Sequence, residues 1–279
     1  MASATTKPVA ESTRTASPAG SRSPASASAS PSAGGGPTPE GRAVRRTARL
    51  TGLLYLAIFV IAPFPFLIVP GLVVVDGDAA ATAANVASSE GLFRAGLVAE
   101  TLVVGIEIVV AGLLYGLLRP VNRSLSFAAA AARLAEAVVQ AVNLFTGGLA
   151  LLIVSGAAYL TVFEPDQLDA LAALFLDLRV FLTMVWGVLF GFHLALLGYL
   201  VYRSGFWPRL LGALLGLASL GYLAQSYGHL LAPQHDGLFA VLVVLLAAPG
   251  ELAFTVWLLW KGIDERRWTE KASAATATA

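Results

Sequence analysis

The stretch Leu92–Leu118, LFRAGLVAETLVVGIEIVVAGLLYGLL, exceeds the ~20 apolar residues that cross a ~30 Å hydrocarbon core. Its charged side chains are few: Arg94, Glu100 and Glu107. Further stretches of this kind fill most of the chain up to Ile263: Leu50–Val75, Leu134–Leu160, Leu171–Tyr202, Leu210–Ala232 and Leu238–Trp260. Helices in soluble cores are rarely so long, so the pattern predicts six transmembrane helices.

Basic residues lie at alternate ends of these stretches. Apart from Arg94, Arg133 and Arg179, every Lys and Arg precedes the first stretch or follows the second, fourth or sixth: Lys7, Arg14, Arg22, Arg42, Arg45, Arg46, Arg49, Arg119, Arg123, Arg203, Arg209, Lys261, Arg266, Arg267 and Lys271. The opposite loops carry acidic residues: Asp76, Asp78, Glu90, Glu164, Asp166, Asp169 and Asp236. By the positive-inside rule, both termini are predicted to be cytoplasmic, in a multi-pass protein of the cytoplasmic membrane.

Composition and loop length define the fold class. Hydrophobic residues make up 57% and charged residues 13% of the chain, and the mean hydropathy is +0.76. A soluble domain has ~25% charged residues. Because most loops between the stretches are short, consecutive helices have to be antiparallel. We therefore predict an all-α polytopic membrane protein, a bundle of six transmembrane helices.

The chain divides into three predicted segments. Residues 1–41 are rich in Ala, Ser and Pro and have few large apolar side chains, so they cannot offset the entropy of ordering. We predict a disordered cytoplasmic tail there. Residues 42–263 form the six-helix transmembrane domain, and residues 264–279 form a short cytoplasmic C-terminal tail.

Glycine pairs four residues apart mark expected contacts between helices. They are Gly112/Gly116, Gly187/Gly191 and Gly212/Gly216. In lipid, small residues at this spacing allow two helices to approach closely. We expect the pairs to be packing seams within the bundle.

Ionisable residues inside the stretches are candidates for a functional site, because such groups are expensive in hydrocarbon. At ~1.5 Å per residue from the basic residue that ends each stretch, Glu107 lies ~18 Å deep, and His193 and Glu251 ~15 Å deep. The three thus share the bilayer midplane. They could relay protons, hold a cation or bind a polar substrate. Alternatively, each is hydrogen-bonded to a neighbouring helix and serves only stability.

A second candidate group is predicted near the outer surface: Glu100, Arg179, Gln225 and His229. Arg179 can form an ion pair with Glu100 or with Asp177. A stripe on the fourth stretch leads from there to the midplane: Arg179, Thr183, Trp186, Phe190 and His193. The plainer alternative is an interfacial ion pair in which Arg179 snorkels to the surface.

The third stretch has its own polar face: Arg133, Glu136, Gln140, Asn143 and Gly147. Arg133 and Glu136 are three residues apart and can form an ion pair near the cytoplasmic end. Gln140 and Asn143 can then form hydrogen bonds to neighbouring helices, so this face is predicted to serve packing.

Five segments carry a family resemblance: ARLTGLLYLAIFV at Ala48–Val60, DAAATAANVASSEGLFRAGLVAETL at Asp78–Leu102, LLYGLLRPVNRSLS at Leu113–Ser126, FHLALLGYLVYRSGFWPRLLGALLGLASLGYL at Phe192–Leu223 and GELAFTVWLLWKG at Gly250–Gly262. In this order they resemble domain-of-unknown-function family 4386. The resemblance implies a six-helix bundle of a small bacterial integral membrane protein, and it implies no activity and no functional residue. The Ala/Ser/Pro-rich tail departs from the family pattern.

Motifs of enzyme chemistry are absent from the sequence. It has no cysteine, no HExxH or GxSxG motif and no nucleotide-binding glycine loop. We predict no catalytic residue, no cofactor, no metal site and no nucleic-acid partner, and we expect contact with the bilayer, including anionic headgroups at the cytoplasmic face. Three functions stay open, in this order: small-solute or proton-coupled transport, a structural or regulatory membrane role, and a membrane-embedded enzyme.

Overall fold

A computed structural model of the chain describes residues 39–277, so nearly all of the predicted N-terminal tail lies outside the described residues. Within residues 39–277, six helical segments are long and apolar enough to cross a membrane: Pro39–Val73, Glu90–Leu118, Arg123–Val154, Pro165–Ser204, Arg209–Leu231 and Pro233–Trp260. They correspond one to one to the predicted stretches. The protein is thus an all-helical, multi-pass membrane protein.

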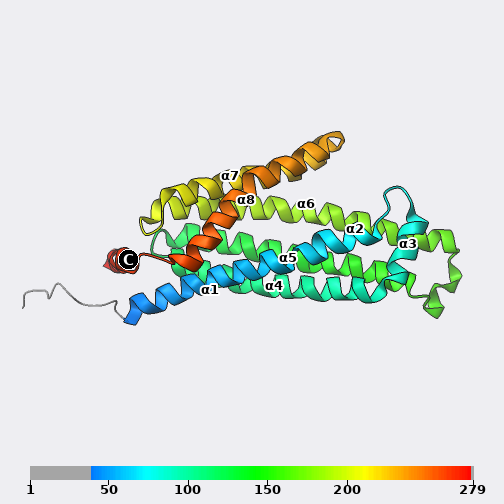
Figure 1. Cartoon of the computed structure of the whole chain (residues 1–279), viewed down its shortest axis with the longest axis horizontal. Helices are drawn as coiled ribbons and strands as arrows, with labels where there is room; N and C mark the ends of the chain where they lie inside the picture. Colours follow the sequence, from blue (N-terminus) through cyan, green and yellow to red (C-terminus); the bar gives the residue numbers. More distant parts are fainter. Residues whose placement is uncertain (1–38, 278–279) are drawn as a thin grey trace, which may run out of the picture. The chain divides into compact units, whose positions relative to one another are not determined.

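The first span contains three helical pieces, α1 (Pro39–Ile61), the π-helix η1 (Phe64–Ile68) and α2 (Val69–Val73). The other spans are α4 (Glu90–Leu118), α5 (Arg123–Val154), α6 (Pro165–Ser204), α7 (Arg209–Leu231) and α8 (Asp236–Trp260) (Figure 1). Shorter helices connect or follow them: α3 (Ala79–Ser88), η2 (Ala158–Val162), η3 (Pro233–His235) and α9 (Glu265–Ala277).

Local chemistry sets the helix ends. The Asn122 side chain accepts a hydrogen bond from Leu125 N at 2.9 Å and caps the start of α5. Gly205 ends α6 in the left-handed conformation, with φ of 77°. Pro39 and Glu40 begin α1 inside the segment assigned to the tail, because proline fits the first helical turn and an acidic side chain there complements the helix dipole.

Prolines reshape the first span. Pro63, Pro65 and Pro70 each lack the backbone N–H that a regular helix needs, and the helix widens into η1 between them. The widened segment packs against α4, where Gly96 leaves room for it. A Cβ on Gly96 would lie 3.2 Å from Val69 Cγ2.

The six spans close into a ring. α1 packs on α4, α4 on α5, α5 on α6, α6 on α7, α7 on α8, and α8 back on α1. Apolar side chains that point out of the ring are highly exposed, among them Val60 at 71%, Phe145 at 70% and Leu231 at 83%. This is the surface expected to face lipid, whereas the buried ionisable residues face the interior of the ring.

Glycines bring the backbones of α6 and α7 together. A Cβ on Gly198 would lie 2.8 Å from both Gly212 O and Gly216 N. A Cβ on Gly212 would lie 2.5 Å from Tyr202 N. The predicted seam is therefore confirmed at Gly212, with the backbone of α6 as its partner, whereas a Cβ on Gly216 would itself meet nothing within 4 Å.

The other glycine pairs differ in outcome. Gly187/Gly191 is confirmed as a seam, because a Cβ on Gly187 would overlap Ser226 Oγ of α7. The prediction is wrong for Gly112/Gly116, where an added Cβ would meet nothing within 4 Å. Spacing alone does not reveal which face of a helix is turned towards a neighbour.

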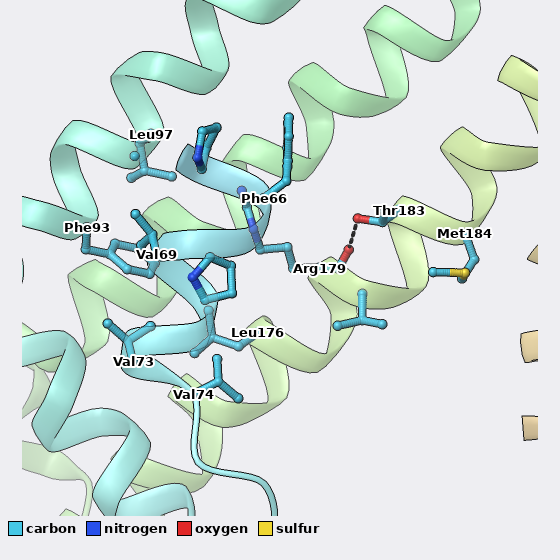
Figure 2. Close-up of a pocket in the computed structure, with 14 residues that line it drawn as sticks. Phe66, Val69, Val73, Val74, Phe93, Leu97, Leu176, Arg179, Thr183 and Met184 are labelled. Carbon is cyan, nitrogen blue, oxygen red and sulfur yellow. Dashed lines mark hydrogen bonds between the residues drawn. The ribbon is translucent and has the colours of Figure 1, made fainter. Parts of the chain in front are cut away.

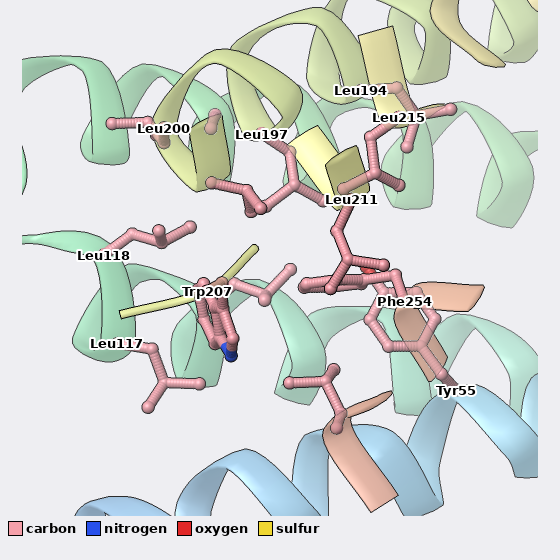
Figure 3. Packing of buried hydrophobic residues seen from close by; sticks show 14 of the residues in the cluster. Tyr55, Leu117, Leu118, Leu194, Leu197, Leu200, Trp207, Leu211, Leu215 and Phe254 are labelled. Atoms are coloured by element: carbon pink, nitrogen blue, oxygen red, sulfur yellow. The ribbon is translucent and has the colours of Figure 1, made fainter. Parts of the chain in front are cut away.

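One end of the ring, the basic end, is where α4, α6 and α8 finish beside Arg119, Arg203 and Lys261. An apolar core closes the interior of the ring towards this end (Figure 3). Its large side chains come from five spans and the α6–α7 loop: Tyr55, Leu117, Leu118, Leu194, Leu197, Leu200, Trp207, Leu211, Leu215 and Phe254.

The segment predicted as a C-terminal tail contains the helix α9, which packs at the basic end. Trp268 is buried, and its Nε1 donates a hydrogen bond to Leu117 O at 2.8 Å. Lys271 Nζ donates to Arg203 O at 2.8 Å. These carbonyls belong to the last turns of α4 and α6, which have no partners within their own helices. α9 thus caps two spans.

Candidate functional site

Glu107, His193 and Glu251 converge inside the ring. Glu107 is 3% and His193 1% exposed, and Glu251 has a fully enclosed carboxyl oxygen. They come from α4, α6 and α8, and Arg133 of α5 lies within electrostatic range of all three. The three residues predicted at the same depth are therefore also grouped around Arg133 in the interior of the ring.

Arg133 is one of four site residues that the sequence prediction missed, together with Tyr55, Glu136 and Tyr222. Its ion pair with Glu136 is present, with 3.5 Å between Nη1 and Oε1, but it lies deep in the ring and not near the end of the span. Both side chains are buried, at 2% and 0% exposure. Counting ~1.5 Å per residue from Arg123 places Arg133 ~15 Å deep, level with His193. The same depth count would have identified it.

Aromatic rings hold the Arg133 guanidinium. Its Cζ lies 5.1 Å from the ring centroid of Tyr55 and 5.5 Å from that of Phe190. Cation–π contacts of this kind contribute about 2 kcal/mol when they are desolvated. Tyr55 belongs to α1, which is not a neighbour of α5 in the ring, so Arg133 reaches across the interior.

The His193 ring is held in one tautomer. Its Nδ1 lies 2.8 Å from Ala129 O, and because a carbonyl only accepts hydrogen bonds, Nδ1 carries the proton. The ring stacks beside Phe190, with 6.0 Å between centroids. In neutral His193, Nε2 therefore presents its lone pair to the site.

Tyr222 is the side chain that α7 contributes to this site. Its hydroxyl lies within electrostatic range of the Glu251 carboxyl. Its ring meets Phe190 edge-on, with 4.7 Å between centroids, and Trp186 stacks on the same Phe190 at 4.9 Å. Every span thus adds at least one side chain to a single site, which we call the central polar site: Tyr55, Glu107, Arg133, Glu136, His193, Tyr222 and Glu251.

Buried polar atoms without a hydrogen-bond partner among residues 39–277 gather in the central polar site. They include Tyr55 Oη, Glu107 Oε2, Arg133 Nε, Glu136 Oε2, His193 Nε2 and Glu251 Oε1, while Arg133 Nη1 and Glu136 Oε1 meet only in their 3.5 Å ion pair. An unpaired buried polar group costs about 1–3 kcal/mol, and a charged one costs more. Native proteins contain few of them, so a cluster calls for an explanation beyond packing.

The central polar site has an excess of carboxyl groups. Glu107, Glu136 and Glu251 stand against the single guanidinium of Arg133. Such a set favours protons or positive charge, because each proton bound removes a buried negative charge. Within residues 39–277, no three His, Asp or Glu side chains are grouped so that they could hold a metal ion.

The predicted outer group contains one real pair. Arg179 Nη2 forms an ion pair with Glu100 Oε2, and Gln140 Nε2 donates to the other carboxyl oxygen. Arg179 Nη1 also donates to Asn143 O at 3.3 Å. Glu100 is 0% exposed, so the pair joins α4, α5 and α6 inside the bundle and is not a surface pair.

Gln225 and His229 do not join that pair. His229 Nδ1 lies 2.8 Å from Asp236 Oδ2, at the turn between α7 and α8. No hydrogen bond or ion pair between described residues links Gln225 to Glu100 or Arg179. α7 packs on α6 and α8 and not on α4, the helix of Glu100, and the His229 ring is bound to Asp236 instead.

Six spans around a buried ionisable site define a multi-pass membrane protein with an internal polar site. The chain belongs to the family described as Domain of unknown function (DUF4386), whose model matches residues 50–262. The match includes every residue of the central polar site, and it confirms the family resemblance found in the sequence.

A relative from Archaeoglobus fulgidus bears the description "Uncharacterized protein". It is 32% identical to this chain over 161 residues, which cover 58% of the chain and 80% of the relative. No solved structure matches the chain significantly. The comparisons therefore show the family and name no activity.

Proposed function

We propose that this protein transports protons, or a small solute coupled to protons, through the central polar site. The observation that carries the proposal is the cluster of buried polar atoms without partners, to which side chains of different spans contribute.

The same bundle shows what a polar network for packing looks like. The Glu100 carboxyl accepts from both Arg179 and Gln140, and the Asn143 amide donates to Thr183 Oγ1 at 3.2 Å. Among the described residues, no enclosed side-chain nitrogen or oxygen atom of that network lacks a hydrogen-bond partner. The central polar site contains several such atoms, although each unpaired group costs stability. The contrast favours a site that binds something over a site that only joins helices.

Each residue has a chemical role in this proposal. Glu107 and Glu251 accept protons at the carboxyl oxygens that lack partners. His193 offers Nε2 as a third proton acceptor, because Nδ1 is held by Ala129 O. Arg133 stays charged and lowers the cost of holding a carboxylate in the interior.

Transport also requires access from both sides. The apolar core closes the site towards the basic end, where Trp207 Nε1 donates to Gly262 O at 2.9 Å and ties the α6–α7 loop to the end of α8. We place this end in the cytoplasm of a cell whose cytoplasmic membrane holds the protein, because the Lys and Arg residues gather there. In the proposed cycle the basic end opens by movement of packed helices.

Replacing Glu107 or Glu251 by Gln tests the transport proposal. These variants keep shape and hydrogen-bonding capacity but remove the titratable proton, so we expect gradient-driven proton flux in proteoliposomes to fall to the level of empty vesicles. Stability is expected to change by no more than about 1 kcal/mol.

The matched control is Glu90→Gln, because the exposed ion pair of Glu90 with Arg94 lies at a helix end outside the site. It should transport as the unmodified protein does. The proposal fails if the unmodified protein shows no flux driven by a proton gradient across a broad solute panel, or if both site variants match the control. A purely structural or regulatory protein would give the first result.

Cysteine labelling tests the orientation. The chain has no cysteine, so single Asn122→Cys and Gln234→Cys variants each carry one thiol, at opposite ends of the ring. We expect an impermeant reagent added to intact cells to label the cysteine at position 234 and not the one at 122. Labelling of the cysteine at position 122 alone would show that the protein has the opposite orientation in the membrane.

A further inference from the structure

A pocket lies apart from the central polar site, between the π-helical part of the first span, α4 and α6. It has a volume of about 190 Å³. Figure 2 shows Phe66, Val69 and Val73 of the first span and Leu176 and Met184 of α6 around it. An apolar cavity of about 150 Å³ already holds a benzene-sized molecule. This pocket therefore has room for a segment of an apolar chain.

The pocket follows from the prolines of the first span. Pro65, inside the widened turn η1, and Pro70, two residues after its end, both line the pocket. Since π-helical turns cost stability and occur mostly at functional sites, the pocket rests on a built feature of the backbone and not on loose packing.

The depth of the pocket matches the membrane interface opposite the basic end. Counting ~1.5 Å per residue from Arg203, Met184 lies ~28 Å and Leu176 ~40 Å along α6, and the hydrocarbon core is ~30 Å thick. Lining residues Val74 and Val180 are 38% and 48% exposed on the apolar outer surface of the ring. The pocket is thus open to lipid.

Arg179 is the charged residue in the wall of the pocket. Its partner Glu100 is 0% exposed, is bonded by Gln140 as well and does not line the pocket, so Arg179 is the member of the ion pair that the pocket meets. A guanidinium has five N–H donors, and the bonds to Glu100 and Asn143 O take one each. Donors remain for an acceptor at the rim.

We propose that this pocket binds an acyl chain of an anionic phospholipid whose phosphate accepts hydrogen bonds from Arg179. The pocket has apolar walls, opens to lipid and lies at the depth of the membrane interface. These three features together favour a lipid acyl chain as its occupant. Arg179, whose side chain is 14% exposed, selects an anionic headgroup, because charge-assisted bonds from Arg to phosphate are strong and directional. The proposal is independent of any transport activity.

A second apolar groove provides a comparison without a charged side chain. It runs between α4 and α5 and is lined by Leu97, Val98, Thr101, Ala141, Leu144, Phe145, Gly148, Leu149 and Leu152. No charged side chain lines it. Lipid bound there should not depend on headgroup charge, so selectivity for an anionic lipid reports on the Arg179 pocket.

Native mass spectrometry of the full chain in neutral detergent tests the proposal. The protein is titrated with dioleoylphosphatidylglycerol, dioleoylphosphatidylcholine, oleate or inorganic phosphate. We expect one phosphatidylglycerol to bind about ten-fold more tightly than phosphatidylcholine, the effect of one charge-assisted contact. Val180→Trp, which fills the pocket from its rim, should remove this preference.

The matched control is Leu178→Trp, on the same helix and also exposed but outside the pocket lining, which should keep the preference. Because Arg179→Gln alone would leave buried Glu100 without its partner, the double variant Glu100→Gln/Arg179→Gln is used, and it should also lose the preference. Equal binding of both phospholipids, unchanged preference in Val180→Trp, or tight binding of oleate or phosphate alone would overturn the proposal.

Discussion

Replacing Arg133 by Met is expected to lower the free energy of unfolding by about 3–5 kcal/mol, the cost of breaking a buried ion pair by removing one partner. Arg133 is the cation nearest to Glu136, and it lies within electrostatic range of Glu107 and Glu251. Without it, the carboxyl groups lose their counter-charge, and the rings of Tyr55 and Phe190 lose their contact. Unfolding in mixed detergent–SDS micelles, followed by circular dichroism, measures the change.

Arg94→Met is the control for this prediction. Arg94 forms an exposed ion pair with Glu90, with side-chain exposures of 59% and 49%, and such pairs contribute at most about 1 kcal/mol. In a companion variant, Glu136→Gln added to Arg133→Met should recover part of the loss, because the unpaired carboxyl is gone. If Arg133→Met were as mild as Arg94→Met, the guanidinium would not be the counter-charge of the site.

Gly212→Leu is expected to destabilise the bundle by about 3 kcal/mol or more, at the upper end of the range for overpacked sites. A Cβ there would lie 2.5 Å from Tyr202 N and 2.6 Å from Gly198 O, and a backbone cannot yield as a side chain can. The helices α6 and α7 would have to separate along their contact. The same unfolding assay measures the loss.

Gly116→Leu provides the comparison, because an added Cβ at Gly116 would meet nothing within 4 Å. We expect its free energy of unfolding to stay within about 0.5 kcal/mol of that of the unmodified protein. Equal losses in the two variants would show that glycine flexibility, and not close packing of α6 on α7, explains the effect.

The number and approximate positions of the spans could be predicted from the sequence, because a membrane helix is recognised by the composition of one continuous segment. Their limits were less accurate, since the third span begins at Arg123 and not at the predicted Leu134. The shared depth of Glu107, His193 and Glu251 was equally accessible, since helix rise is constant. The ion pair of Arg179 with Glu100 was one of two that the sequence allowed, the other being with Asp177, and the structure shows the pair with Glu100. What failed was the grouping of Gln225 and His229 with that pair, because depth carries no information about the direction in which a side chain leaves its helix.

Sequence alone therefore determined the class of fold, the segments that cross the membrane and the depth of each ionisable group. Tertiary structure decided the ring order, the inward position of Arg133 and which glycines touch a neighbour. The physical reason is that the free energy of transferring a helix into lipid depends on the residues of that one segment, so the local sequence is enough to predict it. The rotation of each helix about its axis depends on packing against several others, and only that rotation brings the central polar site together.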